Sequence, residues 1–319
     1  MPIVTMFGGS GFIGRYAARK LARRGWRVRA AVRRPNEAHF LRPYGDVGQI
    51  EPVQANIRDE DSCRRALEGA DAVVNFVGIL SPSGKQSFDA VQAEGAGRVA
   101  RLAAEAGVRR FTQVSAIGAD PRSDADYART KGEGEALVRA AMPEAAILRP
   151  SIVFGEEDAF FNRFARMAQF TPVLPVAGGE TRFQPVYVDD VAEAAVRSLE
   201  GEIAAGRIFE LGGPEVLTMK ELMELMLRIT QRKRVVADVP MGLMRFGAAL
   251  TDWLPFAPVT RDQLKMLAHD NVASGELAGF EAFGIEPKSL ESVLPGYLYR
   301  FRPYGQYARM EKPARPDEA

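Results

Sequence analysis

Tyr127 and Lys131 are the residues of this chain best placed to move a proton. They stand four positions apart in segment 127–141, which is predicted to be a helix, so both side chains share one helix face. A phenol with its ordinary pKa of about 10 is a poor acid or base at neutral pH, but a nearby ammonium stabilises the phenolate. Such a pair can exchange a proton with a carbonyl or alcohol while a nicotinamide carries the hydride. The alternative is two surface residues at helical spacing.

A glycine-rich stretch predicts the binding of a pyrophosphate. Residues 8–14 read Gly-Gly-Ser-Gly-Phe-Ile-Gly, which fits G-x-G-x-x-G from Gly9 and G-x-x-G-x-x-G from Gly8. The apolar run 2–7 predicts a buried strand before it, and 15–24 predicts a helix after it. A strand that turns through glycines into a helix directs backbone N–H groups and the positive end of the helix dipole at one spot. We therefore expect a dinucleotide site here.

Two arginines suggest which dinucleotide is bound. Arg33 and Arg34 directly follow the next predicted strand, 27–32, and no carboxylate stands there. An acidic residue at this point selects NAD by binding the ribose hydroxyls, whereas arginine accommodates a 2′-phosphate. A guanidinium matches a phosphate bidentately, so the sequence predicts NADP(H). The alternative is a solvated arginine pair at a strand end.

Strands and helices alternate regularly up to residue 150 and must position these residues. The predicted strands are 2–7, 27–32, 50–54, 72–77, 110–114 and 145–148. Asp59 is predicted to cap a helix after the third strand, and a long helix is predicted over 87–106. This rhythm predicts an α/β fold with a doubly wound parallel Rossmann sheet, whose ligands lie at the carboxyl ends of the strands. The residues predicted at such ends are Gly8, Arg33, Gly78, Ser115 and Pro150. Their clustering is the best internal evidence for a site.

The pattern changes after residue 150 and predicts a second, smaller, mostly helical C-terminal domain. We expect the Rossmann domain to span 1–150 and to be joined again by about 185–212. The second domain, built from 151–184 and 213–305, would dock a partner, and the charged tail 306–319 would be disordered.

Helix signals within this second half are local. Asp189 and Asp190 are predicted to cap a helix over 191–199, and Thr218 with Glu221 forms a capping box. The apolar stripe of the helix that follows Thr218 is predicted to face the core. It consists of Met219, Leu222, Met223, Met226 and Ile229.

Two apolar or aromatic stretches are candidates for docking. Leu243, Phe246, Leu250 and Trp253 fall at helical spacing within 242–254, and a Pro-Phe-Ala-Pro run follows. This helix either covers a cleft or is presented to a membrane or protein partner. The stretch 297–307 interleaves aromatics with arginines, which suits an anionic interface.

Composition excludes several classes of protein. The chain has 319 residues, with 42 basic against 41 acidic side chains, and this balance argues against a nucleic-acid binder held by phosphate contacts. The lone Cys63 excludes an internal disulfide and fits a reducing cytoplasm. His39 and His269 have no ligands at metal spacing, so we expect no metal site. Because the first predicted strand begins at residue 2, we expect no signal peptide, and we expect no membrane-spanning segment because no apolar run approaches the ~20 residues that span a bilayer.

Several motifs together resemble the extended, atypical branch of the short-chain dehydrogenase/reductases. They are Gly8–Gly14, Tyr127 with Lys131, Leu148–Gly155 and Gln184–Val191. Further stretches are similar to one family in this branch, the NADPH-binding accessory subunits of respiratory complex I (alpha subcomplex subunit 9), in bacterial form. They are Phe40–Gln49, Phe160–Ala165 and Val259–Asp262. The resemblance covers about residues 1–300.

The resemblance implies an NADPH held structurally, without turnover, at the junction of the peripheral and membrane arms. Expected partners are complex I subunits near the quinone site and the membrane surface or its lipid, on the cytoplasmic side of a bacterial inner membrane. The implied cofactor ligands are Gly8, Ser10, Gly11, Phe12, Ile13 and Gly14 at the pyrophosphate, Arg33 at the 2′-phosphate, Asn56 and Ile57 at the adenine, Val77, Gly78 and Ser115 at the ribose side, and Tyr127, Lys131, Pro150 and Ser151 around the nicotinamide.

Three departures from the catalytic pattern affect the interpretation. Asn56 stands where an aspartate is usual, Gln92 replaces a structural asparagine, and Ala116 occupies the position of the catalytic serine beside Ser115. Losing that hydroxyl removes a donor to the developing oxyanion, which is typically worth on the order of 10²-fold or more. We therefore expect an accessory or assembly subunit in which Tyr127 and Lys131 mainly hold the cofactor.

Two other functions stay open at this point. The first is a working NADPH-dependent reductase, epimerase or dehydratase acting on a sugar-nucleotide, isoprenoid or quinone-like substrate, with Tyr127 as the acid/base. The second is a nucleotide-sensing regulator whose affinity for a partner depends on the redox state of the cofactor.

Overall fold

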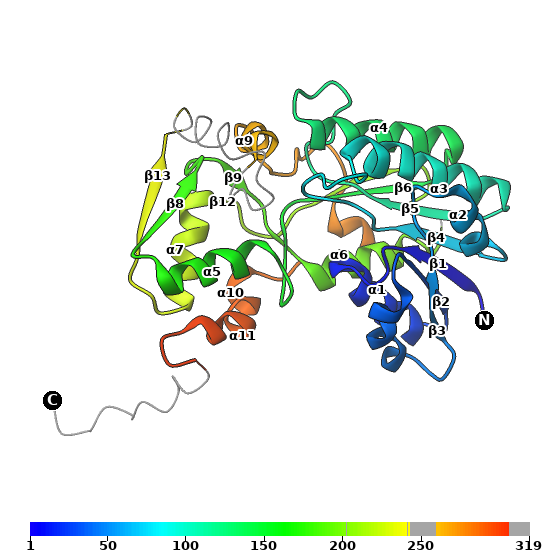
Figure 1. Ribbon diagram of the computed structural model, residues 1–319, viewed down its shortest axis with the longest axis horizontal. Coiled ribbons are helices and arrows are strands. Elements are labelled where there is room, and N and C mark those ends of the chain that lie inside the picture. Colours follow the sequence, from blue (N-terminus) through cyan, green and yellow to red (C-terminus); the bar gives the residue numbers. More distant parts are fainter. Residues whose placement is uncertain (202, 241, 243–259, 306–319) are drawn as a thin grey trace.

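A seven-stranded parallel sheet forms the larger lobe of the molecule (Figure 1). The computed structural model describes residues 1–201, 203–240, 242 and 260–305. The strands lie in the order β11-β6-β5-β4-β1-β2-β3, and all six pairs are parallel. This order confirms the doubly wound Rossmann sheet. The strands are β1 (Ile3–Phe7), β2 (Arg27–Val32), β3 (Ile50–Gln54), β4 (Ala72–Asn75), β5 (Arg110–Val114), β6 (Ala146–Pro150) and β11 (Ile208–Leu211).

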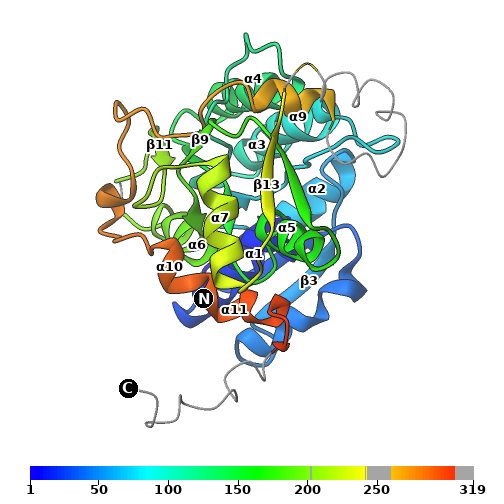
Figure 2. The same cartoon turned by 90° about the vertical axis from the view of Figure 1, so that its left-hand side faces the viewer.

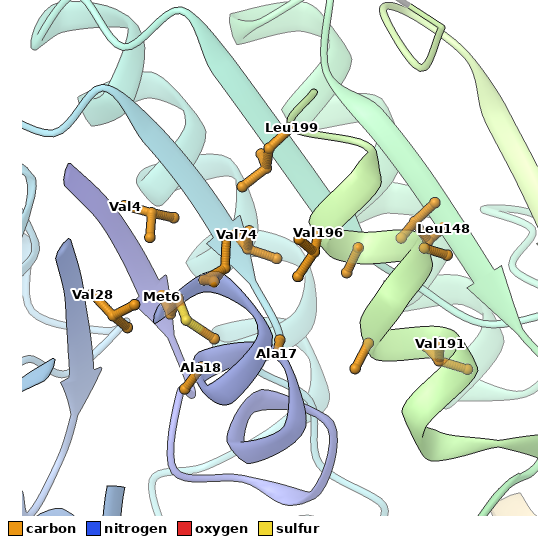
Figure 3. Close-up of a cluster of buried hydrophobic side chains, with 14 of the residues drawn as sticks. Val4, Met6, Ala17, Ala18, Val28, Val74, Leu148, Val191, Val196 and Leu199 are labelled. Atoms are coloured by element: carbon orange, nitrogen blue, oxygen red, sulfur yellow. The ribbon is translucent and has the colours of Figure 1, made fainter. Parts of the chain in front are cut away.

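Helices cover both faces of this sheet. Helices α1 (Phe12–Arg23) and α6 (Val188–Arg197) pack side by side on one face, while α2 (Glu60–Leu67), α3 (Glu94–Glu105) and α4 (Asp126–Ala141) cover the other (Figure 1). Small side chains make the close packing possible: Ala17 and Ala18 of α1 are buried in the same hydrophobic cluster as the strand residues Val4 and Met6 (Figure 3). The two hydrophobic layers fix the sheet, and with it the positions of the strand ends.

The ends of two predicted elements differ from expectation for local reasons. Strand β4 ends at Asn75 rather than Val77, because the Asn75 side chain accepts a hydrogen bond from the Val77 N–H (3.1 Å) and turns the chain. The helix expected over 87–106 begins as a π-helical turn, Asp89–Ala93, before α3. Such π turns are frequent at functional sites. A 3-10 helix, Pro35–Tyr44, follows β2.

A second lobe, which faces the viewer in Figure 2, has its own hydrophobic core. Its helices are α5 (Phe160–Phe170), α7 (Met219–Ile229), α9 (Arg261–Met266), α10 (Leu290–Val293) and α11 (Pro295–Leu298). Strand β8 (Val173–Ala177) pairs with β13 (Val235–Val239), and β9 (Arg182–Phe183) pairs with β12 (Leu217–Thr218). The remaining elements are the strand pair β7 (Val153–Phe154) with β10 (Val186–Tyr187), and the 3-10 turns Phe280–Phe283 and Tyr299–Phe301. The predicted stripe of α7 is buried in this core, and the Thr218–Glu221 capping box is present. Strands β8 and β13 were not expected from the sequence.

The expectation that Asp189 and Asp190 cap a helix is wrong. Helix α6 begins at Val188, so Asp189 and Asp190 lie within its first turn instead of capping it. Asp189 pairs with Lys20 of α1 (3.0 Å), and Asp190 accepts from the Lys288 N–H (2.8 Å). These bonds join elements distant in sequence, which a local pattern does not reveal.

The aromatic stretch 297–307 is also not wholly a docking surface. Tyr297 and Phe301 are buried in the second lobe, whereas Tyr299 and Tyr304 are exposed. The predicted apolar residues of 243–258 and the tail 306–319 lie outside the described residues. Over the described residues, no helix has the length and apolarity needed to cross a membrane.

Candidate dinucleotide site

The turn after β1 closes only because glycines form it. Gly8 has a left-handed φ of +77°, and a Cβ there would lie 3.3 Å from Val77 of the neighbouring strand end. A Cβ on Gly14 would lie 2.5 Å from the Gly8 carbonyl oxygen, so the start of α1 rests directly on the turn. The backbone can approach a ligand closely here because no side chains intervene.

The first turn of α1 offers unpaired donors. Its N-cap is Gly11, which supplies no side-chain cap, and the turn holds no acidic residue. The leading N–H groups of a helix have no intrahelical partner, which leaves those of Phe12, Ile13 and Gly14 for a ligand. Together with the positive end of the helix dipole, they suit a pyrophosphate.

The sheet order brings the other predicted residues to the same edge. Strands β2 and β4 flank β1, so the crossing point of the doubly wound sheet lies beside the glycine turn. Val77 and Gly78 follow β4, and a Cβ on Gly78 would lie only 3.2 Å from the Lys131 Nζ. Gly78 therefore leaves room for the lysine head group of α4.

Tyr127 and Lys131 lie together on α4, as their spacing predicts. The Lys131 Nζ lies 6.0 Å from the centroid of the Tyr127 ring and donates to the Val114 carbonyl (3.4 Å). Burial lowers the pKa of Lys131 to about 8, against the attraction of Glu135. Glu135 itself forms a buried, bidentate ion pair with Arg149 of β6.

The pKa of Tyr127 moves opposite to the expected direction. Burial raises it to about 12, because the phenolate is desolvated beside Phe88, whose ring meets Tyr127 edge-on. The ammonium of Lys131 lies over the ring, too far away to offset burial. In this arrangement Tyr127 keeps its proton at neutral pH, so it can donate a hydrogen bond but is neither a ready acid nor a ready base.

The two serines at the strand ends differ in their hydrogen bonding. The Ser115 hydroxyl at the end of β5 is buried and has no hydrogen-bond partner among the described residues. Buried polar groups are rarely left unpaired, so this hydroxyl is available to a ligand. The Ser151 hydroxyl after β6 instead donates to the Asn271 side chain (2.7 Å), which leaves it less free than the resemblance implies.

The residues expected at the adenosine end lie along β2 and β3. Arg33 is exposed directly after β2 and donates to the Gln86 side chain. The Asn56 side chain accepts from the Arg58 N–H (3.2 Å), and Ile57 is buried against Gly95. Pro150 is the last residue of β6. All the predicted positions therefore lie on α4 or near the carboxyl ends of strands. Arg33 follows β2, whereas Tyr127 lies on α4.

Taken together, the side chains and backbone fit a dinucleotide. An uncapped helix start, a turn that only glycines can make, and an unpaired buried hydroxyl all face one edge of the sheet. A bound nicotinamide would supply the chemistry of hydride transfer. In the described part of the chain, no group of three or more His, Cys, Asp or Glu side chains could hold a metal ion.

The family model for the NAD dependent epimerase/dehydratase family matches residues 4–212. The chain belongs to this family. The mouse (Mus musculus) protein named NADH dehydrogenase (ubiquinone) 1 alpha subcomplex subunit 9, mitochondrial, is 33% identical over 305 residues, which cover 95% of this chain and 81% of the mouse protein. The resemblance to the subunit 9 family is therefore confirmed.

Two further comparisons show which other proteins this chain is similar to. Ceramide reductase of Caulobacter vibrioides is 34% identical over 194 residues, covering 61% of this chain and 60% of its own. The crystal structure of Escherichia coli NADPH-dependent quinone oxidoreductase QOR2 with NADPH has a TM-score of 0.73 at 21% identity and covers 93% of this chain and 99% of that one. At this identity the structure supports the fold alone.

Two of the three predicted departures from the catalytic pattern, Gln92 and Ala116, differ in the hydrogen bonds that their side chains can make. Gln92, on the π-helical turn, donates to the Thr130 hydroxyl (3.1 Å) and accepts from the Ile79 N–H (3.4 Å), so it joins α4 to the end of β4 as a structural residue would. Ala116, by contrast, has no hydroxyl to offer. Its neighbour Ser115 lies at the strand end with its N–H bonded to the Leu148 carbonyl (2.7 Å).

Two residues that support the site were missed at the sequence level. The Asn271 side chain accepts a hydrogen bond from the Ser151 hydroxyl and donates one to the Ile117 carbonyl (3.3 Å). These two bonds connect the ends of β5 and β6 to the second lobe. Asp262 contacts the start of α4. Asp262 fell in a stretch that the resemblance had singled out, but no local signal marked Asn271.

Proposed function

We propose that this protein is an NADP(H)-binding accessory or assembly subunit of respiratory complex I, the NADH:quinone oxidoreductase. The observation that carries the proposal is the similarity to the mouse alpha subcomplex subunit over 95% of this chain, which includes the second lobe as well as the dinucleotide fold. Its place would be peripheral, on the cytoplasmic side of a bacterial inner membrane. The second lobe would contact complex I subunits near the quinone site.

The nucleotide would be structural. Ala116 removes the hydroxyl that stabilises a developing oxyanion, and Tyr127, with a pKa of about 12, gives up its proton reluctantly. The glycine turn and the start of α1 would still bind the dinucleotide. A ligand present at 100 times its dissociation constant stabilises the fold by about 2.7 kcal/mol, so loss of the nucleotide would lower the amount of assembled protein.

The choice of NADP(H) over NAD(H) rests on charge at the end of β2. Arg33, Arg58 and Lys85 have no carboxylate partner in the described part of the chain. Arg58 donates to the Lys85 carbonyl (2.9 Å), next to the Gln86 that Arg33 contacts, so the three cations belong to one group of loops. A 2′-phosphate would supply the missing anion.

This choice is tested by Arg33→Glu, with Arg34→Glu as a control of equal charge one residue away. Arg34 is paired with Glu37 and is largely exposed. We expect Arg33→Glu to weaken the binding of NADPH by tenfold or more while changing the binding of NADH little. Arg34→Glu should have the smaller effect on NADPH binding. Equal weakening of NADPH and NADH by Arg33→Glu would remove Arg33 from the phosphate site.

The proposed function is tested by purifying the tagged full-length protein from native membranes in mild detergent. The eluate is separated on a native gel, and the bound nucleotide is identified after denaturation. Co-migration with the complex I core and a stoichiometric amount of NADPH are expected. A protein that is free of complex I and exchanges its nucleotide would overturn the accessory-subunit proposal.

A second candidate, an active NADPH-dependent reductase, is favoured by two observations. Tyr127 and Lys131 are both present at the predicted site, and a ceramide reductase is among the relatives. Under this alternative the substrate would be a carbonyl compound of lipid or quinone type. Steady oxidation of NADPH with such a substrate, abolished by Tyr127→Phe, would establish it.

A further inference from the structure

The helix that carries Tyr127 and Lys131 is capped from the second lobe. Its own N-cap residue is Ala125, which has no side chain that could accept a hydrogen bond. The Asp262 carboxylate takes that role: Oδ1 accepts from the Asp126 N–H (2.6 Å) and Oδ2 from the Tyr127 N–H (3.0 Å). These are the first two residues of α4, so a cap 135 residues further along the chain satisfies donors that a local side chain normally pairs.

A second contact from the same helix reinforces this cap. The Lys265 ammonium donates to the Asp124 carbonyl (2.6 Å), directly before α4. Asp262 and Lys265 both belong to α9, and together we call them the α9 clamp. The N-terminus of helix α9 is itself stabilised by a capping box, which Thr260 and Gln263 form.

The α9 clamp is attached to the second lobe. The Leu267 carbonyl at the end of α9 accepts from the Thr181 hydroxyl (2.6 Å), and Leu267 packs against the core of the second lobe. The clamp is therefore a direct connection from that lobe to the dinucleotide site. It reaches the backbone of Tyr127 itself, one helical turn before Lys131.

We propose that the α9 clamp positions Tyr127 and Lys131 against the bound dinucleotide, and so couples the second lobe to cofactor affinity. This inference rests on the proposed dinucleotide site and names Asp262 as its positioning residue. A carboxylate at the first turn of a helix is stabilised by the helix dipole, and losing it loosens that turn. Since coupling between two sites is reciprocal, bound dinucleotide must in turn stabilise α9.

The test measures the dissociation constant of NADPH for the full-length protein and its variants. Asp262→Ala is expected to weaken binding about fivefold or more, and Asp262→Asn, which keeps one acceptor oxygen, less. The matched control is Glu215→Ala. The Glu215 carboxylate likewise accepts a remote helix-start N–H, that of Leu290 in α10 (2.8 Å). This control should lose similar thermal stability but keep its NADPH affinity within about twofold.

Hydrogen exchange keeps the proposal testable if Asp262→Ala fails to fold. In the wild-type protein, adding NADPH should slow amide exchange in 261–266 as well as in the first turn of α4. Unchanged exchange in 261–266, or equal NADPH affinity in wild type and a folded Asp262→Ala, would overturn the clamp alone. Failure of the wild-type protein to bind NADPH at all would instead overturn the proposed function and the clamp with it.

Discussion

Replacing Lys131 by methionine is expected to stabilise the unliganded protein at pH 7. The lysine is 7% exposed, and burial lowers its pKa from 10.5 to about 8. Each pKa unit corresponds to about 1.4 kcal/mol, so keeping the charge buried costs about 3 kcal/mol at pH 7. Methionine fills a similar volume without a charge. The same change should abolish tight dinucleotide binding, because the lysine is retained for its ligand and not for stability.

The pH dependence gives the sharper test. In the unfolded chain Lys131 holds its proton up to about pH 10.5, whereas in the folded chain it loses it near pH 8. The unfolded state therefore binds more protons between these values, and the wild-type protein gains stability as the pH rises through this window. The difference in the free energy of unfolding between Lys131→Met and wild type should therefore shrink by about 2 kcal/mol between pH 7 and pH 9.5.

Urea unfolding of both proteins at several pH values measures this difference. Other titrating groups cancel because they are common to both chains, and a packing change from methionine adds only a constant. The exposed Lys220, replaced by methionine, serves as the control and should show a pH-independent difference. If the difference between wild type and Lys131→Met is also constant from pH 7 to pH 9.5, then the Lys131 ammonium is not desolvated and the reasoning is refuted.

Two further substitutions test the packing around the site. Gly14→Ala should destabilise the protein by roughly 1–3 kcal/mol and weaken dinucleotide binding, because the new Cβ would lie 2.5 Å from the Gly8 oxygen. As a control, Gly296→Ala places a Cβ with no atom within 4 Å and should be neutral or slightly stabilising in the same urea assay. Tyr297→Phe should cost roughly 1.5–3 kcal/mol at pH 7 by removing the hydroxyl donor to the buried Asp158 carboxylate. Burial raises the pKa of Asp158, so this loss should diminish in acid as the carboxylate protonates; an undiminished loss at pH 4 would contradict that explanation.

Local signals in the sequence were enough to predict the elements of the sheet. Strands β2, β3 and β5 begin and end where the sequence predicts, because each is a short segment with buried apolar residues between turn signals. The predicted Met-rich core stripe on α7 was confirmed, because apolar side chains at helical spacing face the core together. Where local signals misled, as with Asp189 and Asp190, the carboxylates were already used by partners far away in the sequence.

The sequence by itself determined the glycine turn, the cation at the end of β2 and the Tyr127–Lys131 spacing. These are relations within a few residues, and backbone geometry translates each of them directly into a place on the fold. Only the tertiary structure decided that Lys131 is desolvated, that Tyr127 holds its proton more tightly, and that Asp262 caps their helix. Burial and long-range hydrogen bonds depend on which surfaces meet, and residue spacing does not record contacts between segments more than 100 positions apart.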